Sequence, residues 1–323
     1  MKIATIGSGF IVDHFIQAAR RVEGVEFVAS YSRTRSRAQE FANKHGIEGV
    51  YDSIELMLLD PNVDTVYVAS PNSLHYAQTM QAIQAGKHVI VEKPFAGNLA
   101  RAQEMFDEAK KYGVYIFEAI TTIHLPHFQS IKKAVEDIGP ITVIQANFSQ
   151  YSSRYEALLN GENPNVFNPD FSGGALADIN IYNVHFVVGL FGKPVSLDYI
   201  ARQHDNGVDV SGILTFKYPD FIATLVGAKD SVSDNFVSIQ GERGVVMSPF
   251  ASSMLSKVYT KNQKGSEEIK IQDQPQHMYQ VAAFESIIRN SDKKEYERLM
   301  QHTLDVVSVL EQARLAIDMF YEY

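Results

Sequence analysis

Short apolar runs alternate with amphipathic segments over the first 120 residues. Five runs have the length and the β-branched or aromatic content of strands: residues 3–6, 25–31, 63–69, 88–91 and 114–117. Apolar positions spaced three and four apart predict helices between them, at residues 11–22, 36–45, 73–85 and 99–112. This alternation with short connections predicts a parallel sheet with helices on both faces.

The pattern changes after residue 125. A helix is predicted at residues 126–135, a strand at 142–150, a Pro- and Asn-containing loop at 160–171 and a further helix after it. Strand-like runs follow at residues 195–202, 210–216, 221–228, 236–240 and 245–247, and two helices at 276–289 and 302–320 end the chain. Turn-separated runs of this kind predict a largely antiparallel sheet. Lys293, Lys294 and Arg298 are interpreted as solvated loop residues.

The predicted fold class is therefore α/β with two domains. Residues 1–121 form a dinucleotide-binding domain, and residues 122–323 form an α+β domain with a large, mostly antiparallel open sheet. A chain of 323 residues with 45% hydrophobic content is long enough for both.

Composition narrows the classes of partner. The net charge of −9 gives no reason to expect a nucleic-acid partner. No apolar stretch is expected to approach the roughly 20 residues that span a bilayer. The amino terminus shows no basic-apolar targeting segment, so we expect a cytoplasmic protein without a membrane partner. Cysteine is absent and His spacing fits no metal motif, so no metal site is expected.

A glycine turn follows the first predicted strand. Gly7 and Gly9 stand between this strand and a predicted helix that begins near Phe10 and Ile11. In this order, backbone N–H groups at the helix amino terminus can bind a pyrophosphate. Val12 occupies the third small position of the dinucleotide motif, so the motif is incomplete.

The end of the second strand indicates which cofactor is bound. NAD enzymes usually place an acid there for the ribose 2′-hydroxyl, but this chain has no acid between Glu26 and Glu40. Ser32, Arg33 and Arg37 offer hydroxyl and guanidinium donors that suit a 2′-phosphate. We expect NADP(H), with NAD(H) as the alternative cofactor. The other interpretation is a solvated basic loop.

Lys93 follows the fourth apolar run, within Glu92-Lys93-Pro94. A residue at the carboxyl end of a parallel strand faces the crevice where open α/β sheets bind ligands. Pro94 cannot continue the ladder, so the chain turns there. Lys93 is thus a candidate site residue; a surface lysine at a strand end is the alternative.

A second candidate cluster lies after Gly173 and Gly174. If a helix starts near Asp178, then Asp178, Tyr182 and His185 fall at i, i+4 and i+7 on one helix face. The alternative is a helix cap, a half-buried tyrosine and a surface histidine that are unrelated.

Together these motifs resemble the glucose-fructose oxidoreductase and inositol dehydrogenase (Gfo/Idh/MocA) family over nearly the whole chain. The resemblance is carried by residues 7–11, 70–75, 85–89, 92–94 and 173–182. The Gly-Gly-Ala-Leu-x-Asp-Ile-x-x-Tyr form is similar to that of the dimeric dihydrodiol dehydrogenases and their sugar-reducing relatives. Tyr182 stands where inositol dehydrogenases often carry His.

The resemblance implies a Rossmann domain and hydride transfer between nicotinamide and a carbinol or carbonyl carbon of a sugar, polyol or diol. It implies that Lys93 bridges substrate and cofactor, that Tyr182 is the acid/base, and that Asp178 positions substrate or Lys93. It also implies contacts with the cofactor by the residues Gly7, Gly9, Phe10, Ile11, Ser32, Arg33, Arg37, Ser70, Pro71, Asn72, His75, Glu92 and Lys93. A phenol, with pKa about 10, becomes an effective base when a nearby ammonium favours phenolate.

Three departures from the resembling members affect the substrate prediction. Thr121 and Thr122 follow Glu118-Ala119-Ile120 where Trp and Arg are common, Asn180 replaces Gly, and Asn165 replaces Arg. We expect these changes to reshape the pocket, so a sugar or polyol is as well supported as an aromatic diol. His185 and His124 are candidate substrate contacts, with a structural role as the alternative for each.

Two further expectations concern assembly and class. Residues 210–216 and 221–226 leave Ile, Leu and Val for the outer face of the second sheet, which predicts a homodimer or homotetramer through that face. The family resemblance points the same way. The alternative function is a non-catalytic NADP-binding sensor or regulator on the same fold.

Overall fold

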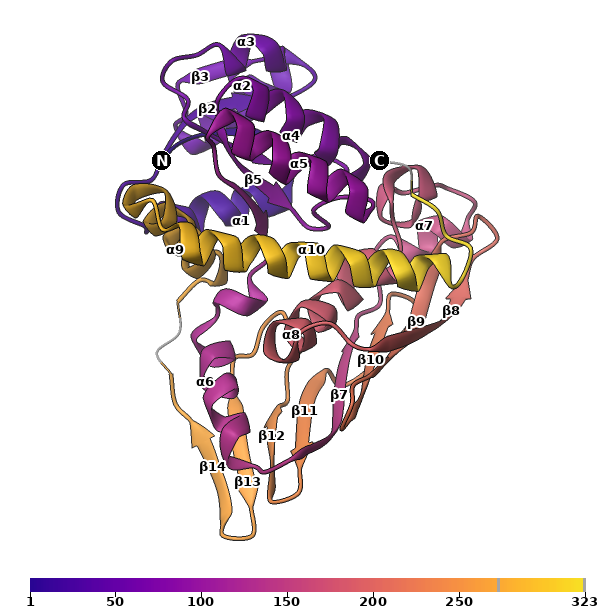
Figure 1. The fold of residues 1–323 in the computed structure, drawn as a ribbon. Helices are drawn as coiled ribbons and strands as arrows, with labels where there is room; N and C mark the ends of the chain where they lie inside the picture. The colour runs from indigo at the N-terminus through magenta and orange to yellow at the C-terminus, as the bar shows by residue number, and fades with distance from the viewer. Residues whose placement is uncertain (272–273, 322–323) are drawn as a thin grey trace. The chain divides into compact units, whose positions relative to one another are not determined.

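The computed structural model describes residues 1–271 and 274–321, and the chain forms two compact units (Figure 1). The first unit contains residues 1–119 and 274–304, and the second contains residues 120–271 and 305–321. The helix α10 (Lys293–Leu315) contributes residues to both. The domain boundary at residues 121 and 122 stays a prediction.

The first unit contains sheet A, which has six parallel strands within the described residues, in the order β3-β2-β1-β4-β5-β6. This is the doubly wound order, in which β1 and β4 start the two halves and ligands bind beyond the carboxyl ends of these strands. The predicted parallel sheet is confirmed. The strands are β1 (Lys2–Ile6), β2 (Glu26–Tyr31), β3 (Gly49–Tyr51), β4 (Thr65–Val68), β5 (His88–Glu92) and β6 (Ile116–Ala119).

Helices cover sheet A, and α4 and α5 pack side by side (Figure 1). The helices are α1 (Phe10–Ala19), α2 (Arg35–His45), α3 (Ile54–Leu58), α4 (His75–Gln84), α5 (Leu99–Tyr112) and α9 (Gln276–Asn290). The sequence did not predict β3 or α3. Three and five residues are too few for a recognisable period, and α3 depends on a local cap, in which the Ser53 side chain accepts a hydrogen bond from the Leu56 N–H.

The late helix α9 belongs to the core of the first unit because aromatic side chains hold it there. Phe284 of α9 stacks on Phe117 of β6, with ring centroids 4.5 Å apart. Phe15 of α1 stacks on Tyr67 of β4 at 3.8 Å, and its edge meets His277 of α9. Each buried Phe side chain stabilises the unit by about 1.5–3 kcal/mol.

The second unit contains sheet B, which has eight strands within the described residues, in the order β14-β13-β12-β11-β7-β10-β9-β8. All neighbours are antiparallel except β7 and β10, so the predicted, mostly antiparallel sheet is confirmed. The strands are β7 (Ile141–Ser149), β8 (Ser196–Gln203), β9 (Asp209–Lys217), β10 (Ile222–Ala228), β11 (Phe236–Gly241), β12 (Gly244–Ser248), β13 (Val258–Asn262) and β14 (Gly265–Ile269). The sequence missed β13 and β14, because their largely polar residues lack an apolar alternation.

Alternation along sheet B separates a buried face from an exposed one. Leu214 and Phe216 are buried, whereas Ile213, the residue before Leu214, and Ile200 on the neighbouring strand β8 are exposed. Ile200 pairs with Ile213, which pairs in turn with the half-buried Val226 of β10. An apolar stripe therefore crosses three strands on the outer face.

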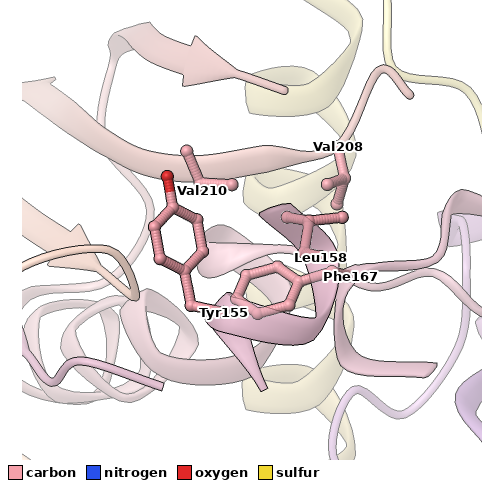
Figure 2. Close-up of a cluster of buried hydrophobic side chains, with 5 residues drawn as sticks. All are labelled: Tyr155, Leu158, Phe167, Val208 and Val210. Carbon is pink, nitrogen blue, oxygen red and sulfur yellow. The ribbon is translucent and has the colours of Figure 1, made fainter. Parts of the chain in front are cut away.

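The helices of the second unit are α6 (Pro126–Ala134), α7 (Tyr155–Leu159), the π-helix Leu176–Asn180 and α8 (Ile181–Phe191). Short helical turns lie at Thr122–His124, Val135–Asp137, Asn165–Phe167 and Pro169–Phe171. Figure 2 shows one apolar cluster that fixes α7 and the loop after it against β9. Its members are Tyr155, Leu158, Phe167, Val208 and Val210.

Two predictions about the end of the chain are wrong: the bounds of the last helix, and the loop position of Lys293, Lys294 and Arg298. The last helix begins at Lys293 rather than 302 and ends at Leu315 rather than 320, so the basic residues predicted to lie in a loop are helical. Its start is polar, and the Asp292 side chain caps it by accepting a hydrogen bond from the Glu295 N–H. A helix with a polar first turn lacks, at its start, the apolar spacing from which a helix is predicted.

The expectation that no stretch approaches the length of a membrane span is also wrong. Within the described residues, the helical stretch Pro169–Phe191 is long and apolar enough by length and composition. However, 72% of its most apolar window is buried inside the protein. A core helix passes the same test, and this stretch carries the candidate cluster around Asp178.

Candidate functional site

The glycine turn of the first unit leaves helix α1 open at its amino terminus. Gly7 has a φ of +118°, and a Cβ added there would lie 2.6 Å from the Ala69 carbonyl oxygen, so only glycine fits. Gly9 is the N-cap of α1, and a Cβ added there meets nothing within 4 Å. The free N–H groups of the first turn therefore suit an anionic group. Phe10 is exposed and Ile11 is half-buried beside them.

A small cleft of about 240 Å³ joins this turn to helix α2. It is lined by Ser8, Arg37, Glu40, Phe41 and Lys44. Ser32 is buried just after β2, and the predicted contacts Arg33 and Arg37 are both exposed. Of the basic side chains, Arg37 and Lys44 border the cleft beside the glycine turn, and cationic donors of this kind suit a 2′-phosphate.

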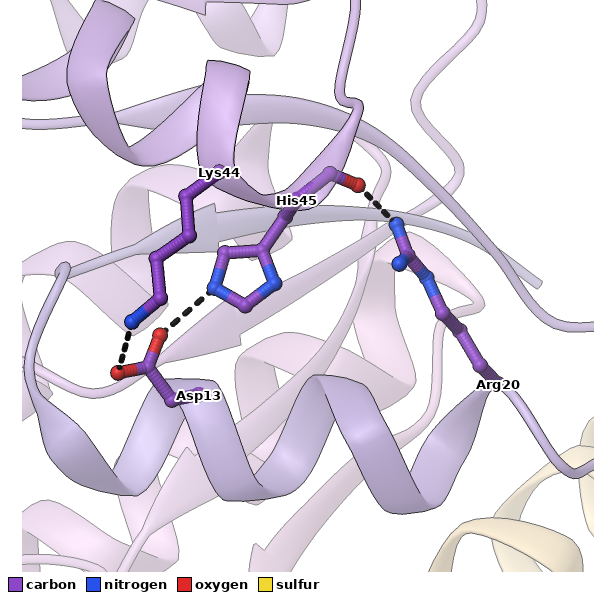
Figure 3. Close-up of polar contacts among 4 residues, drawn as sticks. All are labelled: Asp13, Arg20, Lys44 and His45. Carbon is purple, nitrogen blue, oxygen red and sulfur yellow. Dashed lines mark hydrogen bonds and ion pairs between the residues drawn. The ribbon is translucent and has the colours of Figure 1, made fainter.

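Lys44, which the sequence analysis did not single out, also ties α2 to α1 (Figure 3). Its ammonium lies 2.8 Å from Asp13 Oδ2, and His45 Nε2 lies 2.6 Å from Asp13 Oδ1. Arg20 donates to the His45 carbonyl. Burial acts to raise the pKa of Asp13, but hydrogen bonds from Lys44 and His45 outweigh it and lower that pKa. The carboxylate therefore stays ionised and fixes the wall of the cleft.

Lys93 directly follows β5, the position that the sequence predicted, and its side chain is half-buried. Glu92 before it is buried, and the Tyr67 hydroxyl donates to its carboxylate at 2.6 Å. Burial raises the pKa of Glu92 to about 7. A buried, hydrogen-bonded Glu92 points to a role in holding the end of β5.

His75 connects two of the predicted cofactor segments. Its ring nitrogens lie 3.0 Å from the Pro94 carbonyl oxygen and 2.9 Å from the Ser70 carbonyl oxygen. It is buried, and that burial lowers its pKa. His75 therefore links the Ser70 segment to the turn after Lys93, while Pro71 and Asn72 are half-buried at the start of a helical turn.

In the second unit, a buried carboxylate anchors the Gly173-Gly174 turn. Asp209 of β9 accepts hydrogen bonds from the Leu176 N–H at 2.7 Å and the Tyr199 hydroxyl at 2.6 Å. Gly174 has a φ of +119°, and a Cβ there would overlap the Asp209 carboxylate. Burial raises the pKa of Asp209 to about 6. The sequence gives no local signal for Asp209, because this residue lies 33 residues from its backbone partner Leu176.

The prediction of a regular helix starting near Asp178 is wrong in detail. The helix begins at Leu176 in π form and becomes α-helical at Ile181. Asp178 and Tyr182 are half-buried, and the Tyr182 ring lies 5.9 Å from the Phe148 ring, between centroids. His185 is fully buried, so its access to solvent differs from that of Asp178 and Tyr182. Single π-turns are frequent at functional sites, where they change the direction of side chains.

Asp178 forms an ion pair with Lys229, a residue that the sequence analysis did not identify. Lys229 directly follows β10 and is 5% exposed. A lone lysine at a strand end gives no local signal, because its partner lies 51 residues away. The second unit thus presents a carboxylate paired with a buried ammonium, and the carboxylate precedes Tyr182 by four residues.

The residues at which this chain differs from the family members that it resembles lie in different parts of the second unit. Asn180 is fully buried and its amide donates to the Leu225 carbonyl of β10, in space that Gly227 leaves free, so it faces sheet B. Thr122 is buried and donates to the Ser252 carbonyl. Asn165 lines a cleft of about 430 Å³ together with Arg154. His124 is half-buried at the end of a helical turn.

Among residues 1–271 and 274–321, no group of three or more His, Asp or Glu side chains is placed to hold a metal ion. The grouped polar side chains are instead the ion pairs and hydrogen bonds described above, which hold the candidate residues in place.

Two sequence models match the chain. Residues 1–120 match the oxidoreductase family with an NAD-binding Rossmann fold, and residues 128–247 match the Gfo/Idh/MocA C-terminal domain. Scyllo-inositol 2-dehydrogenase (NADP(+)) of Bacillus subtilis is 34% identical over 323 residues, covering 99% of this chain and 98% of that protein. Trans-1,2-dihydrobenzene-1,2-diol dehydrogenase of Sus scrofa is 31% identical over 76% of this chain and 73% of its own length.

Solved structures agree on the fold. Aldose-aldose oxidoreductase from Caulobacter crescentus has a TM-score of 0.87 at 23% identity, over 98% of this chain and 97% of that one. At this identity the likeness shows the fold alone. With the two sequence models and the full-length relative, it leads to one conclusion: the chain belongs to the Gfo/Idh/MocA family of oxidoreductases, with an NAD-binding Rossmann fold at its amino terminus.

Proposed function

We propose that the protein is an NADP(H)-dependent oxidoreductase that acts on a CH–OH or carbonyl group of a sugar, polyol or diol. The observation that carries the proposal is the half-buried Tyr182 phenol one helical turn after Asp178, in a chain whose other unit is an NAD-binding fold. A full-length relative is an NADP-dependent scyllo-inositol dehydrogenase.

The first unit fits the cofactor. The open N–H groups at α1 suit the pyrophosphate, and Arg37 beside the cleft, with Arg33 and Ser32, suits the 2′-phosphate of NADP. Gly7, Gly9, Phe10 and Ile11 are the proposed contacts at the turn. At and beyond the carboxyl ends of β4 and β5, the proposed neighbours are Ser70, Pro71, Asn72, His75, Glu92 and Lys93.

Bound nicotinamide supplies or accepts the hydride. In this proposal, Tyr182 exchanges the proton at the substrate oxygen, and Asp178 accepts a hydrogen bond from a substrate hydroxyl. Lys93 supplies positive charge to the developing alkoxide. A positioned acid/base contributes roughly 10²–10⁴-fold to the rate. His124 and His185 remain predicted substrate contacts, although His185 is buried in this structure.

We propose a homodimer or homotetramer in the cytoplasm, formed through the outer face of sheet B. The stripe of Ile200, Ile213 and Val226 on that face supports this assembly. A second copy related by a two-fold axis would bring the same apolar stripe against it.

A panel of sugars, polyols and diols, beginning with scyllo-inositol, tests the proposed activity through absorbance at the NADPH band. We expect turnover with NADP⁺ for at least one neutral polyhydroxy compound. The rival is an NADP-binding sensor, which binds NADPH, as nicotinamide fluorescence would show, but turns over no alcohol or carbonyl. Binding without turnover across the panel would favour that rival.

A further inference from the structure

Lys229 is a buried lysine to which the proposed function assigns no role. It follows β10, and its backbone is held on both sides: its N–H donates to the Val210 carbonyl and its carbonyl accepts from the Ser152 N–H, each at 2.8 Å. Its side chain is 7% exposed. Lysine is almost never this buried unless it is paired with an anion, because an ammonium loses its hydration.

The partner of this ammonium is the Asp178 carboxylate. On another side, the ammonium nitrogen lies 5.6 Å from the centroid of the Phe167 ring. Phe167 belongs to the apolar cluster of Figure 2, together with Tyr155 and Leu158. Apolar surroundings lower the local dielectric, so the attraction between ammonium and carboxylate is stronger than on an open surface.

The two partners differ in their access to solvent. Asp178 is 32% exposed in its side chain, whereas Lys229 is almost covered. Asp178 also lies in the π-turn that begins the helix, one helical turn before Tyr182. The carboxylate is therefore held from the protein side by a cation and reaches solvent on the side available to a ligand.

We propose that Lys229 is a positioning residue that keeps the Asp178 carboxylate ionised and fixed, so that Asp178 accepts a hydrogen bond from a substrate hydroxyl. This inference rests on the proposed function, in which Asp178 meets the substrate. A carboxylate at that point favours neutral substrates with an adjacent hydroxyl donor and repels anionic ones. It thereby selects sugars and polyols over hydroxy acids.

Few other ionisable groups lie on the elements packed against the π-turn. Asp209 of β9 is bound to the Leu176 N–H and to Tyr199, and Lys217, the other charged residue of β9, is exposed at the opposite end of that strand. Tyr182 and His185 belong to α8, and Asp230, after Lys229, pairs with Arg202. The sequence of β7 contains no ionisable residue. Among these groups, Lys229 is the cation that forms an ion pair with Asp178.

The test compares Lys229→Met, which keeps the apolar stem, with Lys229→Arg and with Lys217→Met as control. Lys217 is an exposed lysine at the end of β9 in the same sheet. The readouts are kcat and KM from pH 5 to 9, with NADP⁺ and the panel member of highest kcat/KM, and the melting temperature. The Asp178→Asn variant, alone and with Lys229→Met, completes a cycle.

We expect Lys229→Met to raise KM and to lower kcat/KM at pH 7 by roughly tenfold or more, which corresponds to the loss of about 1.4 kcal/mol of binding free energy. The acid limb of the pH profile should move to higher pH by roughly one unit or more, because a nearby cation favours the ionised carboxylate. Lys229→Arg and Lys217→Met should stay near wild type. In the Asp178→Asn background, Lys229→Met should add little.

The inference is overturned if Lys229→Met lowers the melting temperature but leaves KM and the acid limb unchanged. It is also overturned if the loss is equally large in the Asp178→Asn background. Should the single variant not fold, the double variant, which removes both charges, and Lys229→Arg still give the comparison. Failure of the proposed function is distinguishable, because it shows as wild-type turnover by Tyr182→Phe or as no turnover across the panel.

Discussion

The Tyr67 hydroxyl donates a 2.6 Å hydrogen bond to the buried carboxyl group of Glu92, the residue immediately before Lys93. The bond joins β4 to the end of β5, on the sheet half where ligands are expected to bind. A carboxyl group with little access to water controls both the stability of this strand end and the charge beside Lys93.

Glu92→Gln should change how stability depends on pH. Burial raises the pKa of Glu92 from 4.5 to about 7, so the unfolded chain releases this proton at lower pH than the folded one. The stabilisation of the folded state by the protonated Glu92 is fully present below pH about 4.5, and it is lost as the pH rises through 7. A shift of this size corresponds to about 3 kcal/mol.

Urea unfolding of both proteins at pH 5 and pH 8 checks this. From pH 5 to pH 8, the free energy of unfolding of Glu92→Gln should rise by on the order of 2–3 kcal/mol relative to that of wild type. The Tyr67 hydrogen bond lowers the pKa of Glu92, so Tyr67→Phe should move the wild-type loss to higher pH. Parallel stability curves for wild type and Glu92→Gln would show that this carboxyl does not titrate as described.

Cofactor choice should depend on the basic side chains after β2. Arg33→Ala or Arg37→Ala should weaken NADPH binding by roughly 10- to 100-fold, the loss of a charge-assisted contact of about 1.5–3 kcal/mol. NADH binding should change little. Ser32→Asp combined with Arg33→Ala should improve the ratio in favour of NADH, because a carboxylate repels the 2′-phosphate.

Titration by nicotinamide fluorescence measures both affinities. Arg21→Ala is the matched control, since Arg21 is an exposed arginine in the same unit just beyond the other end of α1. Equal affinity of the wild-type protein for NADH and NADPH would refute the interpretation of this segment.

Much of the fold could be predicted because its signals are local. The short apolar runs specified five of the six strands of sheet A, and Gly7 and Lys93 directly follow the strands after which they were expected. Contacts between distant residues could not be predicted. Asp209 and Lys229 each meet the helix of Asp178 from another strand end, and no spacing in the sequence indicates which lysine or aspartate will do so.

Two other features could not be predicted from the sequence, each for a different reason. The π-turn depends on how the segment from Leu176 packs on sheet B and on the Asp209 cap, so a regular helix was the natural expectation. The strand β14 has only polar or exposed positions apart from its last residue. Pairing with β13 holds β14 in place, and the sequence of β14 does not predict this pairing.

Gly174→Ala should destabilise the second unit more than an ordinary change at a left-handed glycine. Any L-residue at this φ costs about 1–2 kcal/mol, and the added methyl would also overlap the Asp209 carboxylate, costing about 1–3 kcal/mol more. Gly161→Ala is the control, because Gly161 has a φ of +82° and open space around it. Melting curves that place both variants together would contradict the packing of Asp209 on this turn.

The assembly is open to a direct check. Ile213→Lys places a charge in the outer stripe of sheet B, beside Ile200, and should turn the proposed dimer or tetramer into monomers. Val232→Lys, at an exposed position outside the strands of that sheet, should leave assembly unchanged. Light scattering at micromolar concentration gives the mass; a wild-type value near the single-chain 36.1 kDa would rule the assembly out.

The most direct test of the central claim is the turnover of Tyr182→Phe, with Lys93→Met and the double variant beside it. If Tyr182 exchanges the proton and Lys93 stabilises the charge, each single change lowers kcat by roughly 10²-fold or more while NADPH still binds. The double variant should lose little beyond the worse single one, as residues that act as a unit do. Near-normal kcat for Tyr182→Phe, with NADP⁺ and the best substrate of the panel, would contradict the account.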